Sequence, residues 1–162
     1  MLDYRQFRQY IVRDTLKLTP WWSQAAENLL LGTAMVESSL IHLAQLGHVS
    51  NGGLGLYQCE KATYNDVCHY LKQRPELCRP ILQLCHYDDF PPAEHLIHDL
   101  RLATFICRMH YWRVPEALPK LDDAPGLANY HKRFYNSASG KTDTGKSTRL
   151  FQFVVDGCFE NN

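Results

Sequence analysis

Glu37 is the residue whose type and position first suggest chemistry. It stands in the stretch TPWWSQAAENLLLGTAMVESSLIHLAQLG, where apolar residues recur at steps of three and four (Leu30, Ala34, Ile41 and Ala44). That spacing places them on one stripe of an α-helix, and Glu37 falls on the same stripe. Because burial disfavours the ionised form of a carboxyl group, an acid held there stays protonated and can act as a general acid. The alternative is a structural glutamate that pairs with a lysine or arginine elsewhere in the fold.

The segment after this helical pattern is rich in glycine. It reads GGLGLYQ over residues 52–58, and glycine lets a backbone approach a ligand closely because it has no Cβ atom. Tyr57 and Gln58 then add a flat apolar ring and an amide. Sugars are bound by this pair of groups, the ring against the C–H face and the amide against hydroxyl or N-acetyl groups. Together with Glu37, the segment predicts a carbohydrate site.

These motifs resemble those of a known family. Glu37-Ser38-Ser39-Leu40 followed by Gly55-Leu56-Tyr57-Gln58 is similar to the E-S-x-[FL] … G-[LI]-[MY]-Q signature of lysozyme-like soluble lytic transglycosylase domains, relatives of goose-type lysozyme. Leu127–Tyr130 and Phe134–Asn136 resemble the later A-x-Y … Y-N motif of that family. The resemblance covers residues 28–141 and extends to small phage-encoded proteins of this type.

The resemblance implies a function and a set of site residues. Glu37 would be the catalytic acid and base that cleaves the β-1,4 bond between N-acetylmuramic acid and N-acetylglucosamine and leaves a 1,6-anhydro product. The residues expected to bind the glycan are Gln58, Tyr57, Ser50, Gly55, Tyr135 and Asn136. The chain departs from the family where Tyr57 replaces a frequent Met and where Ser137-Ala138 replace Ala-Gly after the Tyr-Asn pair.

Two other functions compete with this one. Usual glycosidases use two carboxylates, but no second acid stands out, and the nearest ones, Asp66 and Glu60, have the character of surface or helix-start residues. The absence of an obvious partner favours a substrate-assisted transglycosylase over a hydrolytic muramidase on the same site. A catalytically inactive glycan-binding or structural virion protein is the alternative from another class.

A third pattern suggests nucleotide binding. The stretch SGKTDTGKST, residues 139–148, fits the phosphate-binding pattern G-x-x-x-x-G-K-[ST]. That motif works when a buried strand delivers the glycines to a helix N-terminus. Here KRFYNSAS precedes it and forms no apolar strand, so we interpret the stretch as a surface loop, which the resemblance places beside the cleft.

The elements that must position these residues are mostly helical. We expect helices over 3–16, from Thr19-Pro20 to about 46, near 63–73 and 75–85, over 93–113, and from 122–125 to about 135, then a loop over 136–148 and a last apolar stretch. The predicted fold class is mainly α. It is a single lysozyme-like catalytic domain over residues 1–162, with a small β or loop element after the catalytic helix.

Composition limits the remaining functions. The 162 residues are 45% apolar and 21% charged, with a net charge of zero, which argues against a dedicated nucleic-acid binder. No apolar run reaches membrane-spanning length, and the N-terminus lacks the apolar middle of a signal peptide. The six cysteines form no C-x-x-C pair and are expected to be reduced and mostly buried.

These limits define the expected partners and location. No metal or other cofactor is expected, because the eight histidines show no metal-ligand spacing. The resemblance implies bacterial peptidoglycan glycan strands as the substrate and, for a virion component, phage virion or tail proteins as partners. It places the protein in the phage virion, or in the host cytoplasm before release to the cell wall.

Overall fold

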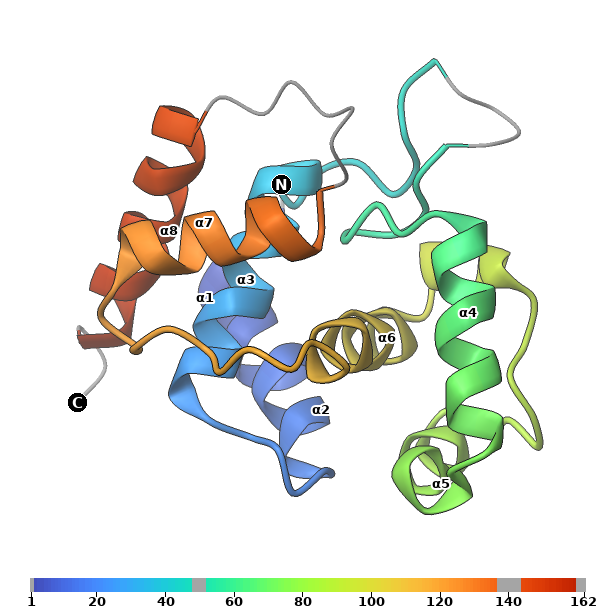
Figure 1. The fold of residues 1–162 in the computed structure, drawn as a ribbon. Coiled ribbons are helices and arrows are strands. Elements are labelled where there is room, and N and C mark those ends of the chain that lie inside the picture. Colours follow the sequence, from blue (N-terminus) through green and yellow to red (C-terminus); the bar gives the residue numbers. More distant parts are fainter. Residues whose placement is uncertain (1, 48–51, 137–143, 160–162) are drawn as a thin grey trace.

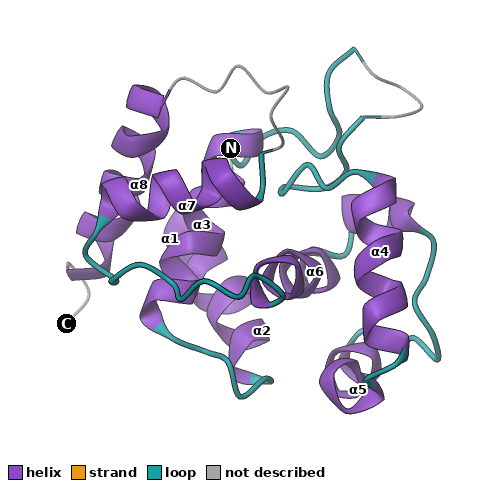
Figure 2. Cartoon of the chain, viewed as in Figure 1, coloured by secondary structure: helices purple, strands orange, loops and turns teal. Residues whose placement is uncertain are grey.

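The computed structural model describes residues 2–47, 52–136 and 144–159, and they are mainly helical, as predicted. In chain order the elements are α1 (Tyr4–Gln6), the π-helical η1 (Phe7–Arg13), α2 (Asp14–Lys17), α3 (Gln24–Ser38), α4 (Lys61–Lys72), α5 (Pro75–Leu84), the 3₁₀-helical η2 (Ala93–Ile97), α6 (Leu100–Trp112), α7 (Ala124–Phe134) and α8 (Thr144–Phe159). Figure 1 shows α3, α7 and α8 grouped on one side, α4 and α5 on the other, and α6 between them. Loops connect these helices (Figure 2).

The first predicted helix is confirmed, because α1, η1 and α2 run without a break. Asp3 caps its start by accepting hydrogen bonds from the backbone N–H groups of Arg5 and Gln6, both at 3.0 Å. Arg13 donates to the fully buried carboxylate of Glu27 at 2.8 and 3.0 Å. This charge-assisted pair fastens the N-terminal helix to the first turn of α3 and offsets the cost of burying the glutamate.

The second predicted helix is shorter than expected at both ends. It begins at Gln24 because Ser23, and not Thr19, is the cap, with the Ser23 hydroxyl accepting from Ala26 N at 3.1 Å. It ends at Ser38 because Ser39 and Leu40 have left-handed backbones, with φ of 54° and 53°. The prediction that the helix continues to about 46 was wrong.

The glycine-rich segment folds back on the loop that follows α3. Gly55 N donates to Leu43 O at 2.9 Å and Gln45 N to Gly53 O at 3.0 Å. Leu54 forms isolated antiparallel bridges with Ala44 and with Cys59, and the described ranges contain no longer strand. The predicted small element is therefore a hydrogen-bonded turn, set directly beyond the end of α3.

The remaining helices agree with the predictions except at two places: one predicted helix is divided, and α8 begins at Thr144, inside the loop predicted over 136–148. Helices α4, α5 and α7 lie where the spacing placed them. The predicted helix over 93–113 divides into η2 and α6, since the Asp99 side chain accepts from Leu102 N at 2.9 Å and starts a new helix there.

The last helix bears on the nucleotide-binding pattern. Helix α8 begins at Thr144, so Lys146 and Ser147 lie in its first turn, while Gly140 falls outside the described residues. The described residues that precede the pattern belong to α7 and to the turn that follows it, up to Asn136, and they include no strand. The strand that a phosphate-binding loop requires is therefore not found among the described residues before the pattern.

The five cysteines with described side chains are free thiols, as predicted, and all except the partly exposed Cys85 are buried. Within the described ranges, no three His, Cys, Asp or Glu side chains gather closely enough to hold a metal ion. The helices described also include none with the length and apolar character needed to cross a membrane.

Candidate active site

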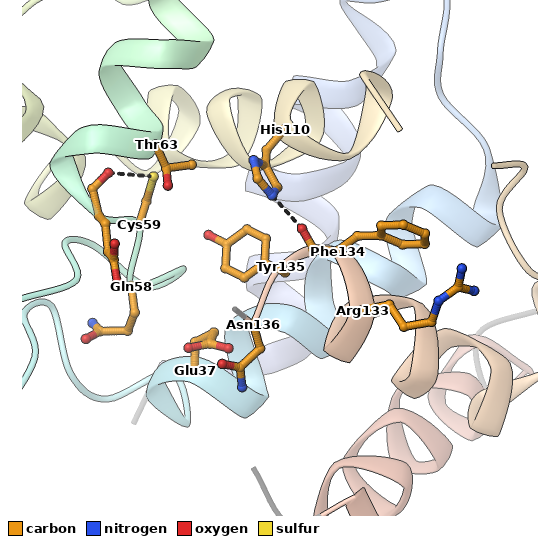
Figure 3. A pocket seen from close by; sticks show the side chains of 10 residues that line it. Glu37, Gln58, Cys59, Thr63, His110, Arg133, Phe134, Tyr135 and Asn136 are labelled. Carbon is orange, nitrogen blue, oxygen red and sulfur yellow. Dashed lines mark hydrogen bonds between the residues drawn. The ribbon is translucent and has the colours of Figure 1, made fainter. Parts of the chain in front are cut away.

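A pocket of about 330 Å³ opens where four parts of the chain meet: the end of α3, the turn before α4, the end of α6 and the end of α7. Figure 3 shows the side chains that line it. They are Glu37, Gln58, Cys59, Glu60, Thr63, His110, Arg133, Phe134, Tyr135 and Asn136. Four of the residues expected from sequence to form a site, Glu37, Gln58, Tyr135 and Asn136, are therefore brought together.

Glu37 lies in the last turn of α3, and its side chain is only 20% exposed. Its Oε1 is 3.1 Å from Nε2 of His131, a side chain on α7 with no exposed surface. This is ion-pair distance, but the direction does not suit a hydrogen bond, and Nε2 has no hydrogen-bond partner in the described structure. Glu37 thus faces the pocket and contacts a histidine, where the sequence had offered a lysine or arginine as the competing partner.

Behind Glu37, His131 belongs to a buried chain of polar groups. Its Nδ1 lies 3.0 Å from the Tyr111 hydroxyl, which lies 2.8 Å from the Thr33 hydroxyl. Thr33 in turn donates to Leu29 O at 2.8 Å. The chain joins α3, α6 and α7 beneath the pocket. Sequence reasoning missed His131, whose only signal is a histidine on the apolar face of the helix that contains ANYHKRF.

Gln58 borders the pocket with a strained backbone. Its φ is 47°, in the left-handed region that residues other than glycine rarely occupy. The side-chain Nε2 donates to Gly55 O at 2.8 Å and to His42 O at 3.4 Å. These two bonds hold the amide between the turn and the loop after α3, at the edge of the pocket (Figure 3).

Tyr135 and Asn136 close the other side of the pocket from the end of α7 (Figure 3). The Tyr135 hydroxyl donates to Tyr57 O at 2.7 Å, which ties this end of α7 to the glycine-rich turn. Burial raises the pKa of Tyr135 well above its ordinary value, so the hydroxyl remains a neutral donor. The two segments that carry the family-like motifs are thus joined directly.

The other predicted binding residues take different places. The prediction that Tyr57 lines the cleft was wrong, because its ring is 1% exposed and its hydroxyl lies 3.0 Å from that of Thr104 in the core. Gly55 also lies away from the pocket. Its φ is 69° and an added Cβ would come within 2.2 Å of Leu96 O, so packing and conformation require the glycine. Ser50 lies outside the described residues.

Six of the ten pocket residues were not expected from sequence to have a role there, and three of these carry an imidazole, a guanidinium or a carboxyl group. His110 Nε2 donates to Phe134 O at 2.7 Å, and burial lowers the pKa of this histidine, so it is neutral near pH 7. Arg133 is held by Glu116 through two hydrogen bonds of 2.8 and 2.7 Å. Glu60 is exposed and lines the pocket, which makes it the second carboxyl group of the site.

Comparison with models of protein families, with curated proteins and with solved structures finds no match to this chain. The geometry of the pocket and the chemistry of its side chains are therefore the basis for a functional proposal.

Proposed function

We propose that the protein is a peptidoglycan lytic transglycosylase that cleaves the β-1,4 bond between N-acetylmuramic acid and N-acetylglucosamine. The observation that carries the proposal is the position of Glu37, whose largely buried carboxyl group faces a pocket that Gln58 and Asn136 also line. A poorly solvated carboxyl beside amide groups suits the protonation of a sugar–sugar linkage. The resemblance of the motifs around these residues supports the same function.

In the proposed reaction, Glu37 acts first as an acid and then as a base. Its proton goes to the glycosidic oxygen while the bond from that oxygen to C1 of the muramic acid breaks, and the substrate's N-acetyl group stabilises the cationic carbon. The Glu37 carboxylate then takes the proton of the C6 hydroxyl, whose oxygen bonds to C1 and closes the 1,6-anhydro ring. The proton returns to Glu37 and no water is consumed.

The test is a turbidity assay on purified cell-wall sacculi. We expect wild-type protein to clear the suspension and Glu37→Gln to reduce the rate at least 100-fold, since general acid catalysis contributes about 10²–10⁴-fold. Glu76→Gln is the matched control, because Glu76 is an exposed glutamate in the first turn of α5, outside the pocket, and should clear normally. Equal clearing by wild type and Glu37→Gln would refute the proposed role of Glu37.

Hydrolysis is the second candidate because Glu60 lines the same pocket. A hydrolytic muramidase would use this second carboxylate to activate a water molecule. Mass analysis of the released muropeptides separates the two reactions. A 1,6-anhydro end supports the transglycosylase, whereas a reducing end, heavier by one water, supports the hydrolase.

The rival from another class is a glycan-binding or structural virion protein without catalysis. It predicts sedimentation of wild type and Glu37→Gln with sacculi to the same extent, with no soluble fragments from either. The proposed enzyme predicts anhydro-muropeptides from the wild type alone. The proposed partners are glycan strands of the bacterial cell wall and, for a virion component, neighbouring phage proteins.

A further inference from the structure

Another pocket, here called the Arg108 pocket, lies beside the candidate active site. It has a volume of about 370 Å³ and is bordered by the end of α6, the segment after it and α7. Glu116 lines it and accepts two hydrogen bonds, of 2.8 and 2.7 Å, from Arg133, which lines the candidate active site. The other walls are mainly aromatic and aliphatic and include Trp112 and Tyr130. Such a concave, largely apolar site suits a ligand with an apolar body.

Arg108 supplies the positive charge of this pocket. The residue is 4% exposed, and in the described structure its one hydrogen bond runs from Nη2 to Trp21 O at 3.3 Å. Its buried Nε has no hydrogen-bond partner there. The guanidinium carbon lies 5.3 Å from the ring centre of Trp112, a contact that involves the flat face of the group and not its in-plane N–H donors. Most donors of this guanidinium therefore have no acceptor within the described protein.

No described acid balances the charge of Arg108. The ion pairs of the described residues do not include it. The carboxylate of Glu116, in the same pocket, is held by Arg133, which lowers the pKa of that carboxyl group. Burial raises the pKa of Cys107 and Tyr130, the two groups that interact electrostatically with Arg108, so both are neutral near pH 7. Burial also lowers the pKa of Arg108, but a guanidinium keeps its proton at this pH. The pocket thus contains a buried positive charge without a counter-charge, which is costly in the free protein.

We propose that the Arg108 pocket binds a carboxylate carried on a small apolar group. The in-plane N–H donors of a guanidinium match the two oxygens of a carboxylate. One uncompensated cation balances one negative charge, which suits a carboxylate better than a phosphate group with its charge of about −1.5 to −2. The ring of Trp112, 41% exposed at the pocket wall, gives the apolar part of the ligand a surface to pack on.

The natural source of this carboxylate is a peptide attached to the glycan strand. This step rests on the proposed function, because muramic acid carries short peptides that end in carboxylates. With the glycosidic bond beside Glu37, a peptide from the neighbouring sugar has to pass the Arg133–Glu116 pair to enter the Arg108 pocket. Arg108 then makes the enzyme favour strands that carry peptides.

The first test measures binding and needs no enzyme activity. The chain has three tryptophans, so the indole N–H signal of Trp112 is readily followed by nitrogen–proton correlation and assigned by its loss in Trp112→Phe. We expect N-acetyl-D-alanine to shift this signal saturably. N-acetyl-D-alaninamide, which has the same shape without the charge, should bind about 10-fold or more weaker, since hydrogen bonds to charged groups are the strong ones. Equal binding of the two compounds, or no binding of the acid, would overturn the proposal.

The second test replaces the cation through Arg108→Met. Affinity for N-acetyl-D-alanine should fall about 10-fold or more. The thermal unfolding midpoint should equal or exceed that of the wild type, because an apolar side chain replaces an unpaired buried charge. Arg101→Met is the matched control: Arg101 is also on α6 and donates to a backbone oxygen, Tyr10 O at 3.4 Å, but lies outside the pocket, so affinity should not change. Unchanged binding with a lower midpoint in Arg108→Met would make Arg108 a structural residue and refute the proposal. If this variant does not fold, the acid and the amide compared on wild-type protein still decide.

The third test identifies the source of the carboxylate. Wild type and Arg108→Met are compared on intact sacculi and on glycan strands whose peptides an amidase has removed. We expect Arg108→Met to lower the rate on sacculi about 10-fold and to leave the rate on stripped strands unchanged. An equal loss on both substrates, or a loss on neither, would refute the peptide as the source and leave a free small acid as the ligand. If wild type degrades neither substrate, the proposed function fails, whereas the binding measurements still decide whether the Arg108 pocket takes a carboxylate.

Discussion

At the scale of single residues, Gln58 combines strain with a place in the pocket. Its left-handed backbone costs about 1–2 kcal/mol, and its side-chain bond to Gly55 O compensates for part of that cost. Strain at such a position is often retained because the side chain is needed there. We infer that the amide is kept for glycan binding, since glycine would suit the backbone better.

Substitutions at Gln58 can separate the backbone strain from the contribution of the amide to glycan binding. Gln58→Ala keeps the strained backbone and loses the hydrogen bond, so we expect it to destabilise the fold by about 1 kcal/mol. Gln58→Gly relieves the strain and should be nearly neutral in thermal unfolding. Both should raise KM for soluble glycan fragments. A KM equal to that of the wild type in both variants would show that the amide only stabilises the turn.

A further prediction concerns the second carboxyl group of the pocket. If the reaction is substrate-assisted, Glu60→Gln should keep the clearing rate within about threefold of wild type, because no water needs activation. A loss of 100-fold or more, as large as that expected for Glu37→Gln, would instead assign Glu60 the role of general base. Rates on sacculi and the mass of the muropeptides, measured on the same samples, distinguish the two.

At the scale of elements, α3 and α8 pack tightly against each other at Gly32. An added Cβ there would lie 2.1 Å from Cε1 of Phe151, a fully buried ring that also packs against His131. We expect Gly32→Ala to lower the unfolding free energy by about 1–3 kcal/mol, because a packed core resists added volume. Urea unfolding measures the change.

The double variant Gly32→Ala with Phe151→Leu tests whether that contact is the cause. The smaller side chain makes room for the new methyl group, so the two changes together should cost less than the sum of the single changes. If the two changes in unfolding free energy are strictly additive, the destabilisation by Gly32→Ala arises elsewhere in α3.

The end of α3 shows where sequence reasoning fails at this scale. The apolar stripe continues through Ile41 and Ala44, so helical spacing alone predicts a longer helix. The helix stops because Ser38 donates to Ala34 O at 2.9 Å and Leu40 N bonds back to its hydroxyl at 3.3 Å. Local bonds of serine to the backbone compete with the helix, and the following loop is then secured by the glycine-rich turn.

At the scale of the whole molecule, local patterns predicted the helices better than they predicted the site. Helices α4, α5 and α7 followed from spacing and caps, and Glu37 was singled out as a charge on an apolar stripe. The burial of Tyr57 could not be predicted, because the order of apolar and polar residues in a turn does not show which side chain faces the core. His131 was missed because its contacts with Glu37, Tyr111 and Thr33 join residues that are distant in sequence and meet only through packing.

That packing also makes a prediction for the stability of the whole fold at high pH. Burial raises the pKa of Cys59 from 9.0 to about 12 and that of Cys68 to about 11. The folded state therefore holds these protons to higher pH than the unfolded chain. The unfolding free energy should be level below about pH 9 and fall above it, with a limiting slope of about 1.4 kcal/mol per pH unit for each thiol. Urea unfolding under reducing conditions over this pH range should show a shallower decline for Cys59→Ala. An identical decline in this variant would mean that other groups cause it.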